Sequence, residues 1–352
     1  MYQIAEQLLS LSNEAAIFVR HSKIAYANAA AELILGRGCA GSSVRTALGP
    51  ELAGAQAASF VADVPIGGKR YAVRVSPAGD GQAYFLSPAD IEPPTLDDDM
   101  ISAMRSVLMS INLSCTLGRA RVEQLGDEEL NKCFISTTRA YYMLARILSN
   151  ASMLAGLTAG TFPFQATSVD LTELCLSIVA SVKEIFSGVE LRTNFPQEAV
   201  VYGDRALLQQ AILNLLSNCF GHASGLSCVS ISLLDCSDRV VLSVMDDGCG
   251  MEQAVINSVF NKPCDEEPLH ISRGARTGLD LVRAVAQRHK GSVIIESRPE
   301  RGTTVRLSLS KGILPASAFF SHGQSYSLPH TALYTGLADC LPEDYFKAAF
   351  HD

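Results

Sequence analysis

The chain of 352 residues lacks several features that would point directly to a function. It has no basic tract and a formal net charge of −8, so we expect no binding to nucleic acid. Its 10 cysteines form no CxxC pair, which argues against a zinc site or a thioredoxin-like redox site. Cysteines such as Cys175 stand within apolar runs, and this usage is typical of a reducing compartment.

Long apolar runs are also absent. No stretch approaches the roughly 18–20 uncharged apolar residues that cross a bilayer, so we predict no transmembrane segment. Residues 1–7 have neither a cationic start nor an unbroken apolar core, and we therefore expect no signal peptide. Together with the cysteine usage, these absences predict a cytoplasmic protein.

The composition that remains is that of a folded chain, with 48% hydrophobic and 18% charged residues. Its length leaves room for two or three domains of about 100–200 residues each. We predict an α+β multidomain protein with the following parts: an N-terminal domain over 1–87, a linker over 88–99, a helical hairpin over 100–160, an α/β domain over 165–311 and a C-terminal extension over 312–352. The aromatic residues of the extension favour packing on a neighbouring domain, and no motif within it indicates a further role.

The N-terminal domain shows a strand–turn–strand pattern followed by a helix over 29–35, which Asn28 is placed to cap. Strands are predicted over 15–19, 24–26, 71–75 and 83–86. This order resembles a PAS sensor domain. No His or Cys stands in an evident cofactor motif, so a protein-contact or dimerisation role is favoured over cofactor binding.

Two amphipathic helices are predicted after the linker. Asp97, Asp98 and Asp99 suit the start of a helix better than a metal site. Apolar residues then recur in two narrow stripes with a break at Gly126-Asp127: Ile101, Met104, Leu108, Ile111 and Cys115, then Phe134, Tyr141, Leu148 and Ala155. A hairpin with such narrow stripes buries them by pairing with another copy, so we predict a homodimeric four-helix bundle through residues 100–155.

Three motifs follow in the α/β domain, in one order. Asn214 and Asn218 lie one turn apart on a predicted helix over 204–219, where amide oxygens suit Mg²⁺. An apolar strand over 240–245 then ends at Asp246, with Gly248 and Gly250 in the turn that follows. The third motif, residues 276–281, enters a helix predicted over 278–289 and would present N–H groups to phosphates.

Together these motifs resemble those of the histidine kinase ATP-binding domain, an α/β sandwich of the Bergerat or GHKL type, and the hairpin resembles that family's dimerisation and phosphotransfer domain. The resemblance implies ATP and Mg²⁺ as ligands, with Asn218 holding the metal, Asn214 beside it and Asp246 accepting from the adenine amine. Further ATP-binding positions follow from the same resemblance: His222, Gly248, Gly250, Thr277, Gly278, Leu279 and Thr303.

The sequence departs from this family at the phosphoacceptor. The family motif typically reads S-H-E-L-R-T-P-L, and the matching stretch begins Ile101-Ser102-Ala103, so Ser102 stands at the histidine position. No histidine occurs between His21 and His222. A serine hydroxyl needs a base to become nucleophilic, which excludes histidine autophosphorylation at the usual site.

The nucleotide motifs are altered as well. Gly221 occupies a position where the family usually carries Lys or Arg, a charge that Arg273 or Arg276 would have to replace. Asp280 replaces a glycine, and either competes with phosphates or closes a capping box with Thr277.

The resemblance therefore predicts a two-component signalling protein built like a sensor histidine kinase, which binds ATP weakly or not at all and acts as a pseudokinase through contacts. A response regulator or an intact kinase is the expected partner. Two alternatives stay open: an active kinase or phosphatase that uses a partner's residue or Ser102, and a non-catalytic dimeric scaffold.

Overall fold

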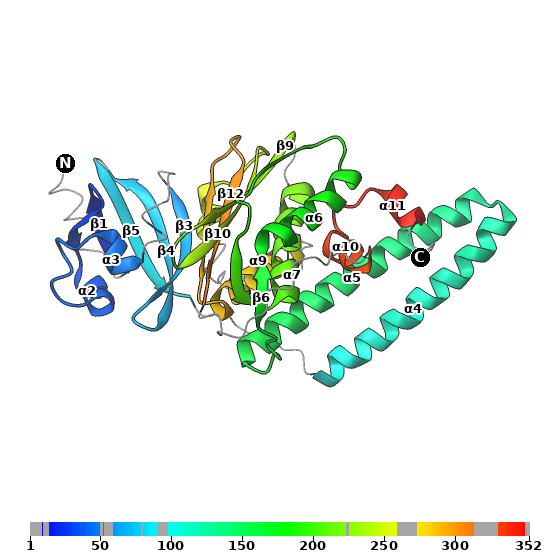
Figure 1. Cartoon of the computed structure of the whole chain (residues 1–352), viewed down its shortest axis with the longest axis horizontal. Coiled ribbons are helices and arrows are strands. Elements are labelled where there is room, and N and C mark those ends of the chain that lie inside the picture. Colours follow the sequence, from blue (N-terminus) through cyan, green and yellow to red (C-terminus); the bar gives the residue numbers. More distant parts are fainter. Residues whose placement is uncertain are drawn as a thin grey trace.

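A computed structural model describes residues 9, 14–49, 52, 59–78, 80–89, 98–222, 225–258, 273–312 and 330–348. Most of the predicted linker (90–97), most of the segment 261–276 and the side chain of His222 lie outside these described residues. A sheet stands at one end of the molecule, a long helical hairpin at the other, and an α/β domain between them (Figure 1).

The N-terminal domain is an antiparallel sheet with two short helices. Its first hairpin joins β1 (Ala15–Arg20) to β2 (Lys23–Ala27) through His21 and Ser22, whose positive φ of 49° and 59° suits a tight hairpin turn. Helix α2 (Ala29–Leu35) begins at Asn28, whose side-chain oxygen accepts from the Ala31 and Ala16 N–H groups. These predicted elements are confirmed.

Two elements of this domain were missed in the sequence: α3 (Val44–Leu48) and strand β3 (Phe60–Ile66). Strand β3 is hard to predict because Asp63 and Pro65 interrupt its apolar pattern, and both residue types are rare inside strands. The remaining strands, β4 (Lys69–Ala78) and β5 (Gly81–Pro88), contain the predicted ones and give the order β2-β1-β5-β4-β3.

The hairpin consists of α4 (Asp98–Leu125) and α5 (Glu128–Ala159). The chain reverses at the predicted break, where Gly126 has a φ of 69° and Asp127 accepts from the Leu130 N–H as the N-cap of α5. The predicted stripe of α4 divides in the structure. Ile101 and Cys115 are buried, whereas Met104 and Ile111 remain 43% and 36% exposed.

Part of this hairpin is also apolar enough to be considered for a membrane. Among the described residues, Met100–Arg119 passes a test of length and composition for a membrane span, and it is 11% buried. A single helix of this kind is weak support, because helices of soluble proteins pass the same test. The predicted absence of a transmembrane segment therefore stays a prediction.

The central domain places helices against one face of a mixed sheet. Its strands are β7 (Glu190–Asn194), β9 (Cys228–Asp235), β10 (Arg239–Asp246), β11 (Ser292–Ser297) and β12 (Thr303–Ser310). Its helices are α6 (Leu171–Ile185), α7 (Arg205–His222), α8 (Gln253–Ser258) and α9 (Arg273–Arg288). Strands β6 (Thr167–Asp170) and β8 (Val200–Gly203) form a separate pair. The layer of α6, α7 and α9 lies between the sheet and α5 (Figure 1).

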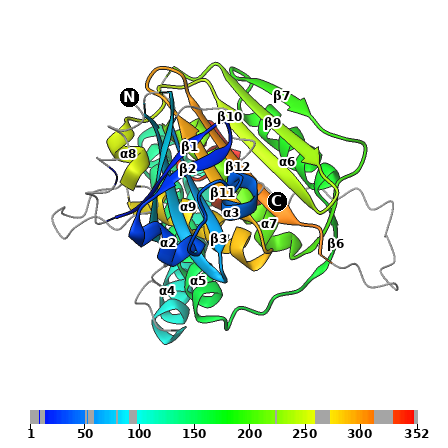
Figure 2. The same cartoon turned by 90° about the vertical axis from the view of Figure 1, so that its left-hand side faces the viewer.

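The N-terminal and central sheets are continuous, which the sequence did not predict. Strand β3 pairs antiparallel with β11, so that Ala62 lies opposite Ile294 and the strands of both domains, apart from the β6–β8 pair, form one 10-stranded sheet (Figure 2). Asp63, which is 0% exposed at this junction, accepts from Arg283 of α9 at 3.0 Å and from Arg70 at 3.2 Å. A buried carboxylate is stable only when it is paired in this way, so the junction is specified by charge as well as by backbone pairing.

The C-terminal extension adds two short helices, α10 (His330–Gly336) and α11 (Glu343–Ala348). They pack against α5 and α7, and Leu337 and Phe346 are fully buried there. The ring of Tyr334 stacks on that of Tyr142 of α5, with 5.4 Å between centroids. The described part of the extension thus covers the contact between the hairpin and the central domain (Figure 1).

Candidate nucleotide-binding site

The residues predicted to bind ATP come from four elements of the central domain. Asn214 and Asn218 lie on α7, Asp246 ends β10, Thr277 to Leu279 lie on α9, and Thr303 begins β12. Two contacts connect these elements directly. The Thr303 N–H donates to Asp246, and a side chain placed at Gly278 would come within 3.0 Å of the Asn214 Oδ1.

Asp246 is a buried carboxylate with a fixed orientation. Its Oδ1 accepts from the Gly248 N–H at 3.0 Å and from the Thr303 N–H at 3.2 Å, and the Cys219 thiol hydrogen-bonds to the same group. Burial raises the pKa of Asp246 above its usual value, although the Gly248 and Thr303 bonds act in the opposite direction. A carboxylate held in this way is suited to accept from a ligand's amine.

The glycines around Asp246 allow two turns to touch. Gly250 has a φ of 64°, and a Cβ there would lie 2.0 Å from the Arg298 carbonyl oxygen. A Cβ at Gly302 would lie 1.9 Å from the Asp246 carbonyl oxygen. No larger residue fits either position, so these glycines fix the backbone next to the buried carboxylate.

Asp247, which the sequence analysis did not single out, anchors the other side of this turn. The side chain accepts from the Ser227 hydroxyl and from the Cys228 N–H, and these bonds lower its pKa to about 2. Two neighbouring carboxylates thus have opposite pKa shifts, because burial dominates at Asp246 and hydrogen bonds dominate at Asp247.

Asn214 is 0% exposed and is held by the hairpin. Its Oδ1 accepts from the Asn150 Nδ2 at 2.9 Å and from the Arg146 guanidinium at 3.2 Å. Its Nδ2 donates to the Gln210 carbonyl at 3.0 Å and to the Asn150 Oδ1 at 3.3 Å. Both ends of this amide are therefore occupied by protein groups.

Arg146 and Asn150 were not identified as candidates from the sequence. A signal was available, because two polar residues one turn apart interrupt the buried face of α5. They are only 2% and 1% exposed, and buried polar residues need specific partners. Their common partner on α7 is Asn214, which lies 64 positions after Asn150 in the sequence. No local pattern therefore connects these residues.

Asn218 differs from Asn214 in having an unused oxygen. Its Oδ1 is buried and forms no hydrogen bond with any group in the described part of the chain. An amide oxygen is a suitable Mg²⁺ ligand, and Mg²⁺ commonly keeps water and phosphate oxygens as its other ligands. No group of three or more His, Cys, Asp or Glu residues among the described ones could hold a metal ion. The unused Asn218 oxygen fits a metal whose other ligands are phosphate and water oxygens.

The third motif differs from its prediction. Helix α9 begins at Arg273, five residues before the predicted start, so the prediction of a helix opening at Gly278 is wrong. Thr277 lies inside the helix, and the predicted capping box therefore does not form its start. Asp280 lies 3.5 Å from the Arg283 guanidinium. The side chains of Arg273 and Arg276 lie outside the described residues.

Gly221 faces the C-terminal extension. A Cβ at this position would lie 3.8 Å from the Cβ of Cys340, and the Cys340 thiol lies 3.9 Å from the Ser217 hydroxyl. The extension thus packs against α7 at Gly221. This is the position where the resemblance implies a Lys or Arg and the chain has none.

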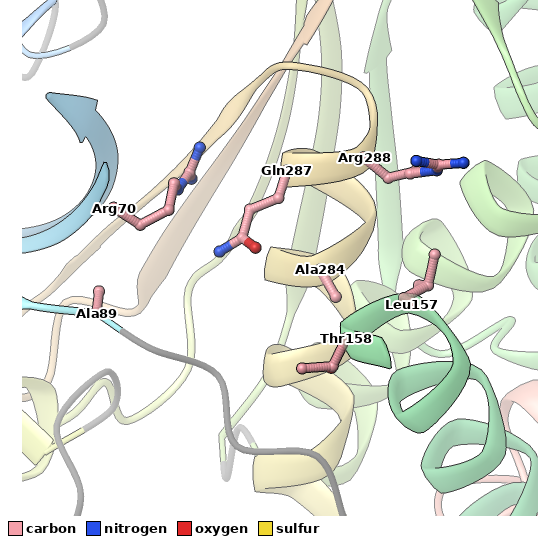
Figure 3. Close-up of a pocket in the computed structure, with 7 residues that line it drawn as sticks. All are labelled: Arg70, Ala89, Leu157, Thr158, Ala284, Gln287 and Arg288. Atoms are coloured by element: carbon pink, nitrogen blue, oxygen red, sulfur yellow. The ribbon is translucent and has the colours of Figure 1, made fainter. Parts of the chain in front are cut away.

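A separate cavity of about 300 Å³ lies where the N-terminal domain, the hairpin and α9 meet (Figure 3). It is lined by Arg70, Ala89, Leu157, Thr158, Ala284, Gln287 and Arg288. Gln287 extends from α9 towards Arg70, while the Arg288 guanidinium lies 4.7 Å from the ring centroid of Phe164. The residues predicted to bind ATP are not among those that line this cavity.

Comparison with known proteins agrees with the site. Residues 203–313 match the family described as histidine kinase-, DNA gyrase B-, and HSP90-like ATPase. The probable sensor histidine kinase TcrY of Mycobacterium tuberculosis is 30% identical over 159 residues, which are 44% of this chain and 33% of that protein. The sensor protein SphS of Synechococcus elongatus is 24% identical over 232 residues, 62% of this chain and 55% of that protein.

A solved structure of the histidine kinase ThkA in complex with the response regulator protein TrrA covers 87% of this chain and 98% of that chain, at 15% identity and a TM-score of 0.39. The chain spans a third to about half of the length of the two curated relatives, 33% and 55%. Residues 203–313, which carry the nucleotide motifs described above, therefore match the histidine kinase-, DNA gyrase B-, and HSP90-like ATPase family, and the chain is similar to sensor histidine kinases.

Proposed function

We propose that this protein is a cytoplasmic, dimeric signalling protein that binds Mg·ATP weakly and does not phosphorylate a histidine of its own. The observation that carries the proposal is Ser102. It is exposed near the start of α4, at the position of the family's phosphoacceptor, and it is followed by Ala103. Imidazole is a nucleophile near neutral pH, whereas a serine hydroxyl without a neighbouring base is not.

The nucleotide part of the proposal rests on two side chains. The buried carboxylate of Asp246 would accept from the adenine amine, and the unpartnered Oδ1 of Asn218 would bind Mg²⁺. The metal would supply positive charge against the phosphates. Gly221 contributes no cation, and we therefore expect an affinity below that of a family member with Lys or Arg there.

The N-terminal domain is proposed to act as a PAS-like input domain. Its strand order, β2-β1-β5-β4-β3, and the helices between β2 and β3 support this proposal. Because β3 continues the central sheet through β11, a change in the N-terminal domain would reach α9 through Asp63 and Arg283.

The hairpin is proposed to form the dimer and to receive the partner. Large apolar side chains remain exposed along α4, including Met104, Val107 and Leu113 at 43%, 59% and 61%. A second copy would cover this face and complete a four-helix bundle. We infer a response regulator or an intact kinase as the partner, which the protein would control by contact rather than by phosphotransfer.

Titration with a fluorescent ATP analogue tests the nucleotide part. We expect saturable binding that needs Mg²⁺ and is lost in Asn218→Ala and in Asp246→Ala. Absence of binding at millimolar nucleotide would leave only the scaffold alternative.

Incubation with γ-labelled ATP tests the chemistry. We expect no label on the protein, whether acid-labile or acid-stable. Acid-stable label that disappears in Ser102→Ala would show instead that Ser102 is an acceptor and would overturn the pseudokinase proposal.

A further inference from the structure

The hairpin buries a cation beside the nucleotide motifs. Arg146 of α5 is 2% exposed, and its guanidinium donates to the Asn214 Oδ1 at 3.2 Å. Asn218, the proposed metal ligand, lies one helical turn further along α7. A guanidinium removed from water requires an anionic partner, because an unpaired buried charge is strongly unfavourable.

That anionic partner is Asp339, which comes from the C-terminal extension. Its carboxylate forms an ion pair and a hydrogen bond with the Arg146 guanidinium. The Asp339 side chain is 26% exposed, whereas that of Arg146 is 3% exposed. The Arg146 guanidinium thus lies in the protein interior, while the Asp339 carboxylate is partly exposed to solvent, where another anion could replace it.

The position of this pair matches a gap in the nucleotide site. Gly221 leaves α7 without the phosphate-facing charge that the resemblance led us to expect, and Cys340, the neighbour of Asp339, lies against Gly221. A planar guanidinium binds phosphate oxygens in the same two-pronged geometry that it uses for a carboxylate.

We propose that Arg146 is the phosphate-binding cation of the nucleotide site, and that Asp339 occupies the place of the phosphate when nucleotide is absent. The inference rests on the proposed nucleotide binding. A bound phosphate replaces the Asp339 carboxylate on Arg146, so nucleotide binding and docking of residues 330–348 oppose each other.

The experiment measures dissociation constants for ATP, ADP and adenosine, with Mg²⁺, on the full chain. Asp339→Asn keeps the size of the side chain and removes its charge. Glu343→Gln is the matched control, because Glu343 lies on the same extension, is 76% exposed and pairs with Arg139 at 4.0 Å rather than with Arg146. Arg146→Met and the double variant Arg146→Met with Asp339→Asn complete a cycle.

We expect Asp339→Asn to bind ATP and ADP about tenfold more tightly than the wild type, which corresponds to about 1.4 kcal/mol. Adenosine affinity should stay unchanged, because it has no phosphate for Arg146. Glu343→Gln should match the wild type, and the double variant should show no gain over Arg146→Met. Circular dichroism and urea unfolding of each variant establish that it is folded.

Three results would overturn the inference while leaving nucleotide binding intact. These are wild-type affinity in Asp339→Asn, an equal gain for adenosine, and a gain that persists without Arg146. If neither the wild type nor any folded variant binds ATP at millimolar concentration, both the inference and the proposed nucleotide site are wrong.

Discussion

The central domain and helix α4 differ in how far they match what the sequence resemblance implies. In the central domain, Asp246 is buried and oriented by backbone N–H groups, and the Asn218 Oδ1 has no hydrogen-bond partner among the residues that the structure describes. At the position of α4 that the resemblance assigns to the phosphoacceptor, Ser102 is exposed and is followed by Ala103. The proposed nucleotide site thus carries the side chains that the resemblance implies, whereas the proposed phosphoacceptor position carries no histidine.

The two regions also differ in what their buried polar groups contact. Burial of the Asp246 carboxylate is unfavourable for the apoprotein, because burial disfavours the charged form and raises its pKa. A ligand that donates to this carboxylate would offset that cost. The hairpin instead contacts the central domain, because Arg146 and Asn150 of α5 bind the Asn214 amide.

The largest effect is expected where the central domain is joined to the N-terminal sheet. Replacing Asp63 by Ala leaves Arg283 and Arg70 without their carboxylate, and we expect unfolding free energy to fall by about 3–5 kcal/mol, the typical loss on breaking a buried pair. Urea unfolding measures this change. If the fused sheet is what holds the central domain in its nucleotide geometry, ATP affinity falls in the same variant.

The control for this prediction is Asp80→Asn. Asp80 pairs with Arg20 at 2.7 Å, but the two side chains are 45% and 44% exposed. An exposed pair contributes about 0–1 kcal/mol, so the control should unfold nearly like the wild type. Equal losses in the two variants would show that the junction has no special role.

The second prediction tests the preserved chemistry of the central domain. Asp246→Asn removes the charge from the group that would accept from the adenine amine. We expect ATP binding to weaken by about 1.5–3 kcal/mol, the range for a hydrogen bond to a charged group. The same change should raise stability at pH values above the unfolded-state pKa of about 4, and the gain should grow until the pH has passed the raised folded-state pKa. Because burial raises the folded-state pKa of Asp246, ionisation opposes folding as pH rises through that pKa.

Calorimetric titration and urea unfolding of one sample separate these two effects. Weaker nucleotide binding together with a more stable fold would identify Asp246 as a residue kept for its ligand. A variant that binds ATP like the wild type would remove the main support for an adenine-reading role.

The third prediction concerns the proposed dimerisation of the hairpin. Met104 is 43% exposed on α4, and covering it in a dimer would remove part of its apolar surface from water. We expect Met104→Ala to weaken dimerisation by about 1–2 kcal/mol over the two copies, following the usual free energy of apolar burial. Sedimentation equilibrium measures the change, with Leu234→Ala as the control, since Leu234 is 63% exposed on β9, away from the hairpin. A wild type that stays monomeric at high micromolar concentration would refute the dimer.

Local patterns in the sequence predicted much of this structure. Asn28 is predictable as a cap because its side chain accepts from an N–H of the helix that directly follows it. Gly126-Asp127 is predictable as a break because glycine permits a positive φ and Asp127 caps the helix that begins at the next residue. The strand ending at Asp246 was visible from its alternating apolar residues and the glycines after it. Such features depend on neighbours a few residues away.

Features that join distant segments were not predictable in this way. The β3–β11 pairing connects Ala62 with Ile294, and Asp63 meets Arg283 of α9 only in the folded chain, because 220 positions separate the two residues. The start of α9 was missed because Gly274 and the polar residues around it favour a loop in isolation. Arg146 likewise gains its meaning only from Asn214 and Asp339.

The smallest effect is expected at Asp247, next to Asp246. Its pKa is lowered to about 2 by the Ser227 hydroxyl and by the Cys228 and Ser227 N–H groups, so the charged form is favoured by folding. A lowered folded-state pKa adds stability above the unfolded value of about 4 and loses it as pH falls towards about 2. Because Asp247 is exposed, solvent screening keeps the contribution below about 1 kcal/mol.

Comparison of Asp247→Asn with Asp246→Asn in urea between pH 3 and pH 8 measures both neighbours on one scale. The Asp247 variant should be slightly less stable than the wild type at pH 7 and should approach it as pH falls. The Asp246 variant should show the opposite sign, with its advantage growing as pH rises. Slopes of the same sign would mean that burial does not dominate at Asp246, and the proposed nucleotide site would then rest on Asn218 alone.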